Sequence, residues 1–465
     1  MMTHGNISEI SVHIVGGGLA GSEAAWQVAR AGIPVTLHEM RPVKMTPAHQ
    51  TGNLAELVCS NSLKSLDESS APGLLKTEMA AMDSLIIRAA IKARVPAGQA
   101  LAVDRIVFAD AVKSGLLETG LVTITPGEVT SLPTPEEASA RGEFWIVASG
   151  PLTSHPLADA LQKLTGSTRS LYFYDAIAPV LAAESIDMSH AFRADRYGDG
   201  DSGDYLNVPL SKDEYESFID SVIAAEKMPL HDFEEPKYFE SCLPVEVMIE
   251  RGRDTLRFGP MKPVGLTDPR TGHRPWAAIQ LRQENQDGTM FSMVGFQTKM
   301  KWPEQKRVFS MIPALRNVEI LRYGSIHRNT YLKSPEFLGP DLSFKAAPRI
   351  FLAGQISGVE GYTESAAMGL LAGRACVAKS RGQEFTMPPR ETMIGALGRY
   401  VTEGCLGPYQ PMNANFGLLP PPPAVTHDPS RKKPKKLSKA DRKTLIADRA
   451  RQTFAAYQSS TTPSS

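Results

Sequence analysis

The pattern of apolar and polar positions is most regular at the start of the chain. Residues 12–15 form a short apolar run that leads directly into glycines, which is typical of a buried strand. Residues 23–31 then suit a helix, Gly32 suits its C-terminal cap, and residues 34–38 suit a second strand. This order of strand, turn, helix and strand predicts the beginning of a parallel α/β sheet.

The same pattern returns near the end of the chain. Residues 144–148 form a short apolar strand, and residues 349–353 form another that runs into a glycine-rich turn and a helix over 365–379. A long helical pattern also covers residues 73–93. From about residue 191 to 324 the chain carries more charge, Pro and Gly and has no repeating strand–helix unit.

These patterns predict an α/β protein with a Rossmann-type dinucleotide-binding domain made of two chain segments and an inserted α/β domain between them. The predicted divisions are 1–185 and 325–423 for the two segments, 186–324 for the inserted domain, and 424–465 for a tail. Residues 420–423 are all proline and predict a stiff spacer before that tail.

Composition narrows the class of protein. A chain of 465 residues is long enough for two or three domains, and its 50 basic and 50 acidic residues leave no overall charge that would attract a polyanion. No apolar run reaches the length of a membrane span, and the N-terminus lacks a secretion signal pattern. The four cysteines are widely spaced and form no C-x-x-C. We therefore expect a cytoplasmic protein with free thiols and no metal site.

The tail has its own character. Residues 431–451 are basic and compatible with a helix, whereas residues 459–465 are expected to be disordered. The basic stretch predicts either nonspecific affinity for phosphate or a solubilising role, and composition does not separate the two.

The glycine-rich turn after the first strand fits G-x-G-x-x-G. A helix N-terminus of this kind binds pyrophosphate, because its free N–H groups and partial positive charge face the ligand. Glu39, at the end of the second strand, is placed to accept the ribose hydroxyls. Arg41 has two interpretations, a contact to a 2′-phosphate or a solvated charge. The predicted cofactor-binding residues of this unit are Gly16, Gly17, Gly18, Leu19, Ala20, Gly21 and Glu39.

The late glycine-rich turn distinguishes FAD from NAD. Gly354 and Gln355 follow a strand and precede a helix, so a second helix start is expected to face the same cofactor. Flavoproteins of the glutathione-reductase type have this arrangement. FAD is therefore the predicted cofactor.

The cysteines differ in their surroundings. Cys376 lies in an apolar helical stretch and Cys405 has no polar partners nearby in sequence, so both are interpreted as inert. Cys59 and Cys242 lie in polar, irregular segments, Cys-Ser-Asn-Ser and Glu-Ser-Cys-Leu-Pro, and are the candidate reactive thiols.

Several segments resemble the bacterial folate- and FAD-dependent tRNA (uracil-5-)-methyltransferases. The resemblance extends over roughly residues 10–420 and includes segments with no general structural reason to recur. The matching segments are residues 16–27, 56–63, 239–246, 251–266, 326–330, 354–365 and 410–417.

This resemblance implies a reaction. A T-loop uridine of tRNA, position 54 in the family's substrate, would receive a methyl group at C5. The carbon would come from 5,10-methylenetetrahydrofolate by way of reduced FAD, with NADH or NADPH as the reductant. Attack of a thiolate on C6 makes C5 nucleophilic. The family match assigns that attack to Cys242 and an assisting role near the flavin to Cys59.

The resemblance also suggests contacts to substrate. The basic run that contains Arg251, Arg253, Arg257 and Lys262 is expected to contact folate carboxylates or RNA phosphate. Lys299, Lys301 and Trp302 would extend that surface. His327 and Arg328 have two interpretations, a place near the flavin or a structural polar cluster. Val208 stands where many relatives carry cysteine, so a thiol there is not required.

Three alternatives remain open at this stage. One is the related flavoprotein that modifies the tRNA wobble uridine, which is normally longer. Another is the same chemistry on ribosomal RNA. The third is a flavin-binding RNA chaperone whose cysteines are inert.

Overall fold

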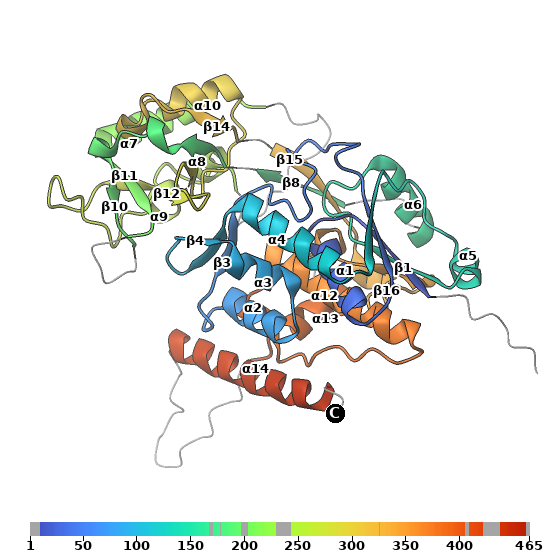
Figure 1. Ribbon diagram of the computed structural model, residues 1–465. Helices are drawn as coiled ribbons and strands as arrows, with labels where there is room; N and C mark the ends of the chain where they lie inside the picture. The colour runs from blue at the N-terminus through green and yellow to red at the C-terminus, as the bar shows by residue number, and fades with distance from the viewer. Residues whose placement is uncertain are drawn as a thin grey trace, which may run out of the picture.

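The computed structural model describes residues 10–166, 171–176, 178–196, 203–228, 243–324, 326–404, 409–421 and 438–461. They form two lobes (Figure 1), here called the first lobe, around a six-stranded sheet with the glycine turn, and the second lobe, around a six-stranded antiparallel sheet. A two-stranded ribbon lies between the lobes, in which β8 (Leu171–Ala176) pairs antiparallel with β15 (Ile326–Tyr331).

The sheet of the first lobe has the order β16-β17-β7-β1-β2-β6. All neighbouring strands are parallel except β16 and β17. The bounds are β1 Ser11–Val15, β2 Val35–Glu39, β6 Val122–Pro126, β7 Glu143–Val147, β16 Ser343–Phe344 and β17 Ala347–Leu352. The predicted Rossmann-type sheet built from an early and a late segment is thereby confirmed.

The first lobe is completed by helices and a small antiparallel sheet. Its helices are α1 Leu19–Arg30, α2 Ala71–Ala81, α3 Leu85–Lys92, α4 Arg105–Glu118, α5 Pro135–Ala140, α6 His155–Thr165, α11 Ser334–Phe337, α12 Tyr362–Ser380 and α13 Met393–Glu403. The small sheet has the order β3 (Ser62–Ser65), β5 (Ala100–Val103) and β4 (Arg94–Val95).

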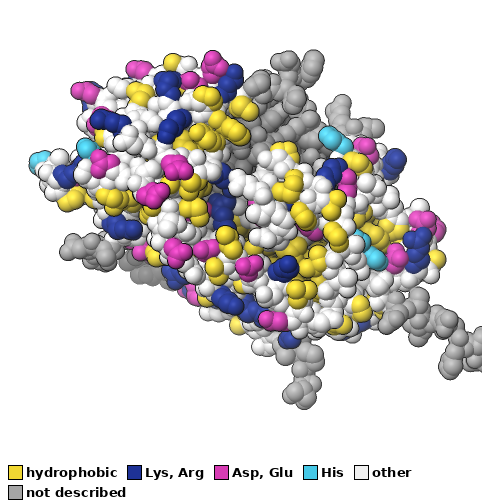
Figure 2. Space-filling view, turned by 45° about the horizontal axis from the view of Figure 1, so that its top comes forward, with side chains coloured by type: hydrophobic (Ala, Val, Ile, Leu, Met, Phe, Trp, Pro, Cys, Tyr) yellow, Lys and Arg dark blue, Asp and Glu magenta, His cyan; other side chains and the backbone are white. Residues whose placement is uncertain are grey.

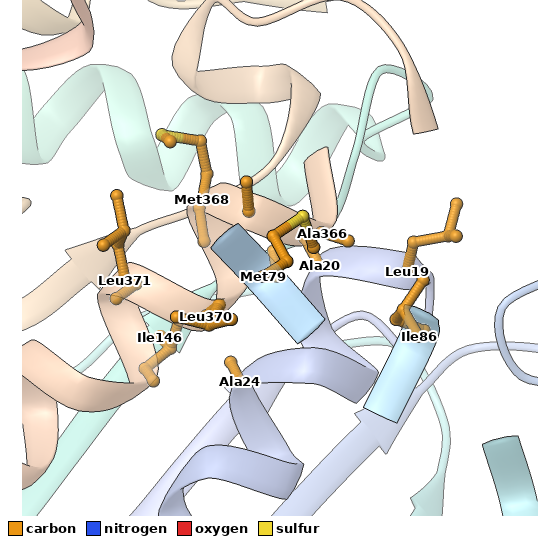
Figure 3. Close-up of a cluster of buried hydrophobic side chains, with 14 of the residues drawn as sticks. Leu19, Ala20, Ala24, Met79, Ile86, Ile146, Ala366, Met368, Leu370 and Leu371 are labelled. Atoms are coloured by element: carbon orange, nitrogen blue, oxygen red, sulfur yellow. The ribbon is translucent and has the colours of Figure 1, made fainter. Parts of the chain in front are cut away.

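Helices α1 and α12 pack with their backbones in close contact. A Cβ atom at Gly369 of α12 would lie 2.1 Å from the carbonyl oxygen of Ala20 on α1. Further along the two helices, a Cβ atom at Gly373 would lie 3.0 Å from the Ala24 carbonyl oxygen, and Figure 3 shows Ala20 of α1 beside Ala366 of α12. Helix α1 begins at Leu19 rather than at the predicted residue 23, so Ala20 directly follows the early glycine turn. The late turn lies at the same place, because a Cβ atom at Gly354 would be 2.7 Å from Ala20 Cβ.

The single helix predicted over residues 73–93 is wrong, because the chain breaks between α2 and α3. Ser84 caps α3, where its hydroxyl accepts a hydrogen bond from the N–H of Ile87. The buried carboxylate of Glu23 on α1 accepts from the Ser84 hydroxyl at 2.6 Å and from the Ile86 N–H at 2.9 Å. A partner that is distant in sequence therefore stabilises the break.

The sheet of the second lobe has the order β10-β11-β12-β13-β9-β14, with antiparallel neighbours throughout. This explains why residues 191–324 show no repeating strand–helix unit. The strands are β9 Val180–Ala182, β10 Phe192–Arg193, β11 Leu206–Leu210, β12 Ala277–Gln283, β13 Met290–Met293 and β14 Ile320–Arg322. The helices are α7 Lys212–Ala224, α8 Val245–Glu250, α9 Thr255–Phe258 and α10 Trp302–Phe309. Strand β9 lies before the predicted boundary at residue 186, and the predicted divisions stay predictions.

Short 3-10 helices complete the described elements: η1 Ala183–Ser185, η2 Met188–His190, η4 Pro313–Leu315, η5 Gln355–Ser357 and η6 Phe416–Leu418.

The tail ends in a long helix, α14 (Lys439–Thr461), which lies along the underside of the first lobe in Figure 1. Its buried side chains include Ile446, Ala450 and Phe454, and Gln458 donates to the carbonyl of Ala81 at 2.8 Å. The predicted disorder of residues 459–465 is therefore wrong for residues 459–461, which belong to the docked helix, and residues 462–465 lie outside the described part of the chain. Residues 431–437 lie outside the described part of the chain. No helix among the described residues is long and apolar enough to span a membrane.

The α1–α12 contact predicts that replacing Gly369 by alanine destabilises the protein more than the same change at Gly115. Gly369→Ala places a methyl group against backbone, which cannot move aside, and should lower the free energy of unfolding by about 3 kcal/mol. Gly115→Ala on α4 meets side chains and no backbone, with Leu85 Cδ1 nearest at 2.6 Å and Arg88 Nη2 at 3.5 Å. The Leu85 side chain can turn, and alanine favours the helix, so the change should stay within about 1 kcal/mol. Denaturant unfolding of both variants measures the difference, and equal losses would show that the backbone contact is not limiting.

Candidate functional site

A cavity with an empty volume of about 1030 Å³ lies where the early and late glycine turns meet. One wall comes from the end of β1 and the start of α1, with Gly16, Gly18, Leu19 and Ala20. The facing wall comes from Gly354, Gln355 and Tyr362, between the end of β17 and the start of α12. The structure thus brings these predicted cofactor-binding residues together in one pocket.

The glycines of the early turn have different roles. A Cβ atom at Gly18 would meet no protein atom within 4 Å, so this backbone is open to the cavity. Gly16 has φ +102°, a backbone conformation that favours glycine. A Cβ atom at Gly21 would lie 1.8 Å from the Gly16 carbonyl oxygen, so Gly21 serves the packing of the turn itself. Gly17 does not line the cavity, and its N–H donates to Glu39 Oε2 at 2.8 Å.

Glu39 lines the cavity and is held by a buried ion pair. Arg41 Nε donates to Glu39 Oε1 at 2.9 Å, and Arg41 Nη1 donates to Glu56 Oε2 at 3.0 Å. The Arg41 side chain is 2% exposed. Burial by itself would raise the pKa of Glu39, but the hydrogen bonds and charge of Arg41 outweigh it and lower that pKa. The interpretation of Arg41 as a solvated charge is wrong, because the side chain is buried and paired with Glu39 and Glu56.

His49 lies beside this cluster and also lines the cavity. Its Nδ1 is 2.6 Å from the hydroxyl oxygen of Thr46. Burial, followed by the nearby charge of Arg41, lowers the pKa of His49 to about 4. The imidazole is therefore neutral at physiological pH, and two carboxylates face one guanidinium at this end of the pocket.

Cys59 lies at the edge of the same cavity, since its neighbour Val58 and the phenol of Tyr362 both line it. The N–H groups of Cys59 and Ser60 donate to the Tyr362 hydroxyl oxygen at 2.6 and 3.2 Å. Burial raises the pKa of Tyr362, which keeps the phenol neutral. A candidate thiol and the predicted cofactor pocket are therefore adjacent.

Of the three other cysteines, the structure describes only Cys376. Cys376 is fully buried in α12, and burial raises the pKa of its thiol, which fits the prediction that it is inert. Cys242 and Cys405 lie outside the described residues. The chain resumes just after Cys242 at Leu243, which is buried, and the Val245 N–H donates to the carbonyl of Gln297 at 2.8 Å.

The predicted basic run lies around α8 and α9 of the second lobe. Arg253 is ion-paired with Glu216 and Asp220, each at 2.7 Å. The guanidinium of Arg257 stacks 3.6 Å from the ring centroid of Trp276. In Figure 2, acidic and basic side chains are interspersed over the exposed face of this lobe. This face is therefore not a uniform cationic patch.

The other predicted contact residues are placed as follows. Arg251 is exposed and Lys262 is half-buried in the same run. Lys299 pairs with Glu250 at 3.5 Å and Lys301 with Glu226 at 2.7 Å. Trp302 is 57% exposed, and its ring stacks on Tyr323 with centroids 5.5 Å apart. His327 and Arg328 lie on β15, opposite residues 175 and 174 of β8, and their side chains lie outside the described part.

Comparisons with known proteins agree over almost the whole chain. The family model described as "Glucose inhibited division protein A" matches residues 11–384. The Methylenetetrahydrofolate–tRNA-(uracil-5-)-methyltransferase TrmFO of Geobacter sulfurreducens is 52% identical over 440 residues, covering 95% of this chain and 97% of that protein. The chain belongs to the TrmFO family. The member from Myxococcus xanthus is 51% identical over 450 residues, covering 96% of this chain and 94% of its own length.

Solved structures support the same fold. A crystal structure of Aquifex aeolicus GidA matches with a TM-score of 0.66 and 16% identity. The match covers 97% of this chain and 74% of GidA, so the neighbour is the longer protein. At this identity the likeness shows the fold, which agrees with the two-segment organisation of the TrmFO family member described here.

Sequence reasoning missed several residues of the site. Glu56, His49 and Glu128 line the pocket, and Arg105 and Arg322 contact the Cys59 segment. Tyr362 had a local signal, because it begins the helix that follows the late glycine turn. The others depend on contacts between distant segments, so no local pattern indicated them.

His49 predicts a pH dependence of stability. In the unfolded chain this histidine takes up a proton near pH 6.5, whereas in the folded protein it does so only near pH 4. The unfolded state therefore binds more protons between these values, and stability falls as pH drops from 6.5 towards 4. In His49→Gln the thermal unfolding midpoint should fall less between pH 7 and pH 5. His190→Gln, at an exposed position, is the control, and an unchanged slope in His49→Gln would refute the assignment.

A substitution at Gly18 is expected to weaken FAD binding without affecting the folding of the apoprotein. Its φ of −72° suits any L residue, and a side chain there points into open space. Gly18→Val should leave the unfolding midpoint of the apoprotein nearly unchanged and weaken FAD binding about 100-fold, or about 2.7 kcal/mol. Fluorescence titration with FAD measures the change. Unaltered affinity would place the cofactor elsewhere.

Proposed function

We propose that this protein methylates C5 of the T-loop uridine of tRNA, with 5,10-methylenetetrahydrofolate as the carbon donor and FAD as the cofactor. The observation that carries the proposal is 52% identity, over 95% of this chain and 97% of the relative, to a methyltransferase named for that donor and that base. The glycine turn, the pocket and the adjacent thiol are the parts such a reaction needs.

The pocket fits FAD. The open backbone at Gly18 allows a pyrophosphate to approach the start of α1 closely, and Glu39 faces the cavity as a charged ribose acceptor. Gly354 and Gln355 would hold the opposite side of the cofactor, near the start of α12. Bound FAD would carry the one-carbon unit and supply its reducing equivalents. NADH or NADPH would restore the reduced state from solution.

Two thiols would act on the uracil. We assign attack on C6 to the Cys242 thiolate, which forms a C–S bond and moves the electron pair of the C5–C6 double bond into an enolate that is nucleophilic at C5. After C5 has accepted the carbon at the methylene level, a base would remove the C5 proton as the bond to the carrier breaks, which leaves a methylene group on C5. A hydride supplied by the reduced cofactor would then complete the methyl group, and the electron pair returning to the ring would expel the Cys242 thiolate. Cys59, at the edge of the cofactor pocket, would assist that proton transfer.

Substrate contacts belong to the second lobe in this proposal. Arg251, Arg253, Arg257 and Lys262 would contact the folate tail or the phosphates of the T-arm. The existing pairs of Arg253 with Glu216 and Asp220 mean that this arginine must exchange partners on binding. His327 and Arg328, on β15, keep both sequence interpretations, a place near the flavin or a structural polar cluster. Because the substrate is cellular tRNA, the enzyme would work in the cytoplasm.

A labelling experiment tests the function. The purified protein with bound FAD is incubated with unmodified tRNA, labelled methylenetetrahydrofolate and NADH. We expect one label in the T-loop uridine. Label at the wobble position, or only in ribosomal RNA, would support the corresponding alternative, and no transfer would support the chaperone interpretation.

Two separate cysteine substitutions, one at each of two positions, test the mechanism. Cys242→Ala should lower transfer at least about 1000-fold, since nucleophilic assistance is lost. Cys376→Ala, which removes a buried and unreactive thiol, should retain most of the activity. Transfer unaffected by Cys242→Ala would contradict the assigned attack, even if the labelled product were correct.

A further inference from the structure

The segment from Leu57 to Ser60 has no regular secondary structure, yet side chains from three distant elements hold its backbone. Arg105, the first residue of α4, donates from Nη1 to the Leu57 carbonyl. Arg322, the last residue of β14, donates from Nη2 to the Val58 carbonyl. Tyr362 accepts the N–H groups of the next two residues.

These contacts join the two lobes at the thiol. Arg322 belongs to the sheet of the second lobe, where β14 pairs with β9. Arg105 belongs to the first lobe, and its Nε donates to Glu284 Oε2 of the second lobe at 2.8 Å. Asn61 continues the junction, since it donates to the carbonyl of Gln283 at 2.9 Å. The position of Cys59 is therefore fixed by both lobes together.

The cluster also has an excess of positive charge. The guanidinium groups of Arg105 and Arg322 face one carboxylate, that of Glu284. Both also lie close enough to Cys59 for a negative charge on its sulfur to stabilise their positive charges. Among the described residues, Arg105 Nη2 and Glu284 Oε1 are buried without a hydrogen-bond partner. Leaving such groups unmatched costs stability, so a cluster chosen for stability alone would not be arranged in this way.

We propose that Arg105 and Arg322 are positioning residues for Cys59, which fix its backbone segment and place positive charge beside its sulfur. Their effect on catalysis rests on the proposed function, whereas their effect on the thiol does not. Arg322 is the better residue to test, because it donates directly to the Val58 carbonyl, whereas loss of Arg105 would also leave Glu284 without its ion-pair partner.

The first experiment measures the thiol itself in the FAD-loaded protein. Iodoacetamide modification of the peptide that contains Cys59 is followed by mass spectrometry across pH. The thiolate is the reacting form and a neighbouring cation favours it, so Arg322→Met should slow modification at pH 7 about tenfold. Arg322→Lys keeps a cationic donor, so its modification rate should stay within about threefold of the rate of the parent protein.

Arg374→Met is the matched control. Arg374 is a partly buried arginine on the far side of α12 that also donates to a backbone carbonyl, that of Met82 at 2.8 Å. The Arg374→Met substitution should leave the modification rate of Cys59 unchanged. A parental rate in Arg322→Met, or an equal loss in Arg374→Met, would overturn the proposal. FAD content and the unfolding midpoint of each variant show that the comparison is between folded holoproteins.

The second readout is catalytic. Arg322→Met should lower kcat for methyl transfer about 10- to 100-fold, as expected when a reacting group is displaced, and leave KM for tRNA within about twofold. Arg322→Lys should restore most of kcat. A change in KM alone would contradict positioning and indicate a tRNA contact. If the parent transfers no methyl group, the alkylation result still decides the role of the arginines, so the two failures are distinguishable.

Discussion

The site depends on the close approach of α1 to α12. The carbonyl of Ala20 faces Gly369, and no side chain separates the two backbones. This contact joins residues that are more than 300 positions apart in sequence and places both glycine turns at one cavity. A larger residue at the contact would push the late turn away from the early one. The pocket is therefore a consequence of helix packing as much as of the G-x-G-x-x-G motif.

A second constraint is the polar junction between the lobes. The contacts at Asn61, Arg105 and Arg322 are hydrogen bonds and ion pairs rather than apolar packing. Such contacts have directional geometry and lose stability when a partner is missing. The segment that carries Cys59 lies within this junction, so the position of its backbone depends on how the two lobes are placed relative to each other. This arrangement relates the thiol to the second lobe, from which the proposed RNA and folate contacts come.

Local patterns were sufficient to predict the strand and the glycine turn that line the cavity. The strand, glycine turn and Glu39 could be predicted because each follows from nearest neighbours in sequence. Arg41 could not, since its buried state depends on Glu56 across a loop. The break between α2 and α3 depends on Glu23 of α1, and the last turn of α14 depends on docking against the first lobe. Cys59 was identified as a candidate, but not the residues that hold it, because Arg322 lies on another lobe. Tertiary contacts decided each of these cases.

The central claim is that the early and late glycine turns form one FAD pocket. Hydrogen–deuterium exchange of the apoprotein, with and without FAD, tests it most directly. FAD should slow exchange together in peptides covering residues 15–21 and 354–365, at the same FAD concentration and with little change in the sheet of the second lobe. Protection of the early segment alone, or protection centred on β10 to β14, would contradict the account.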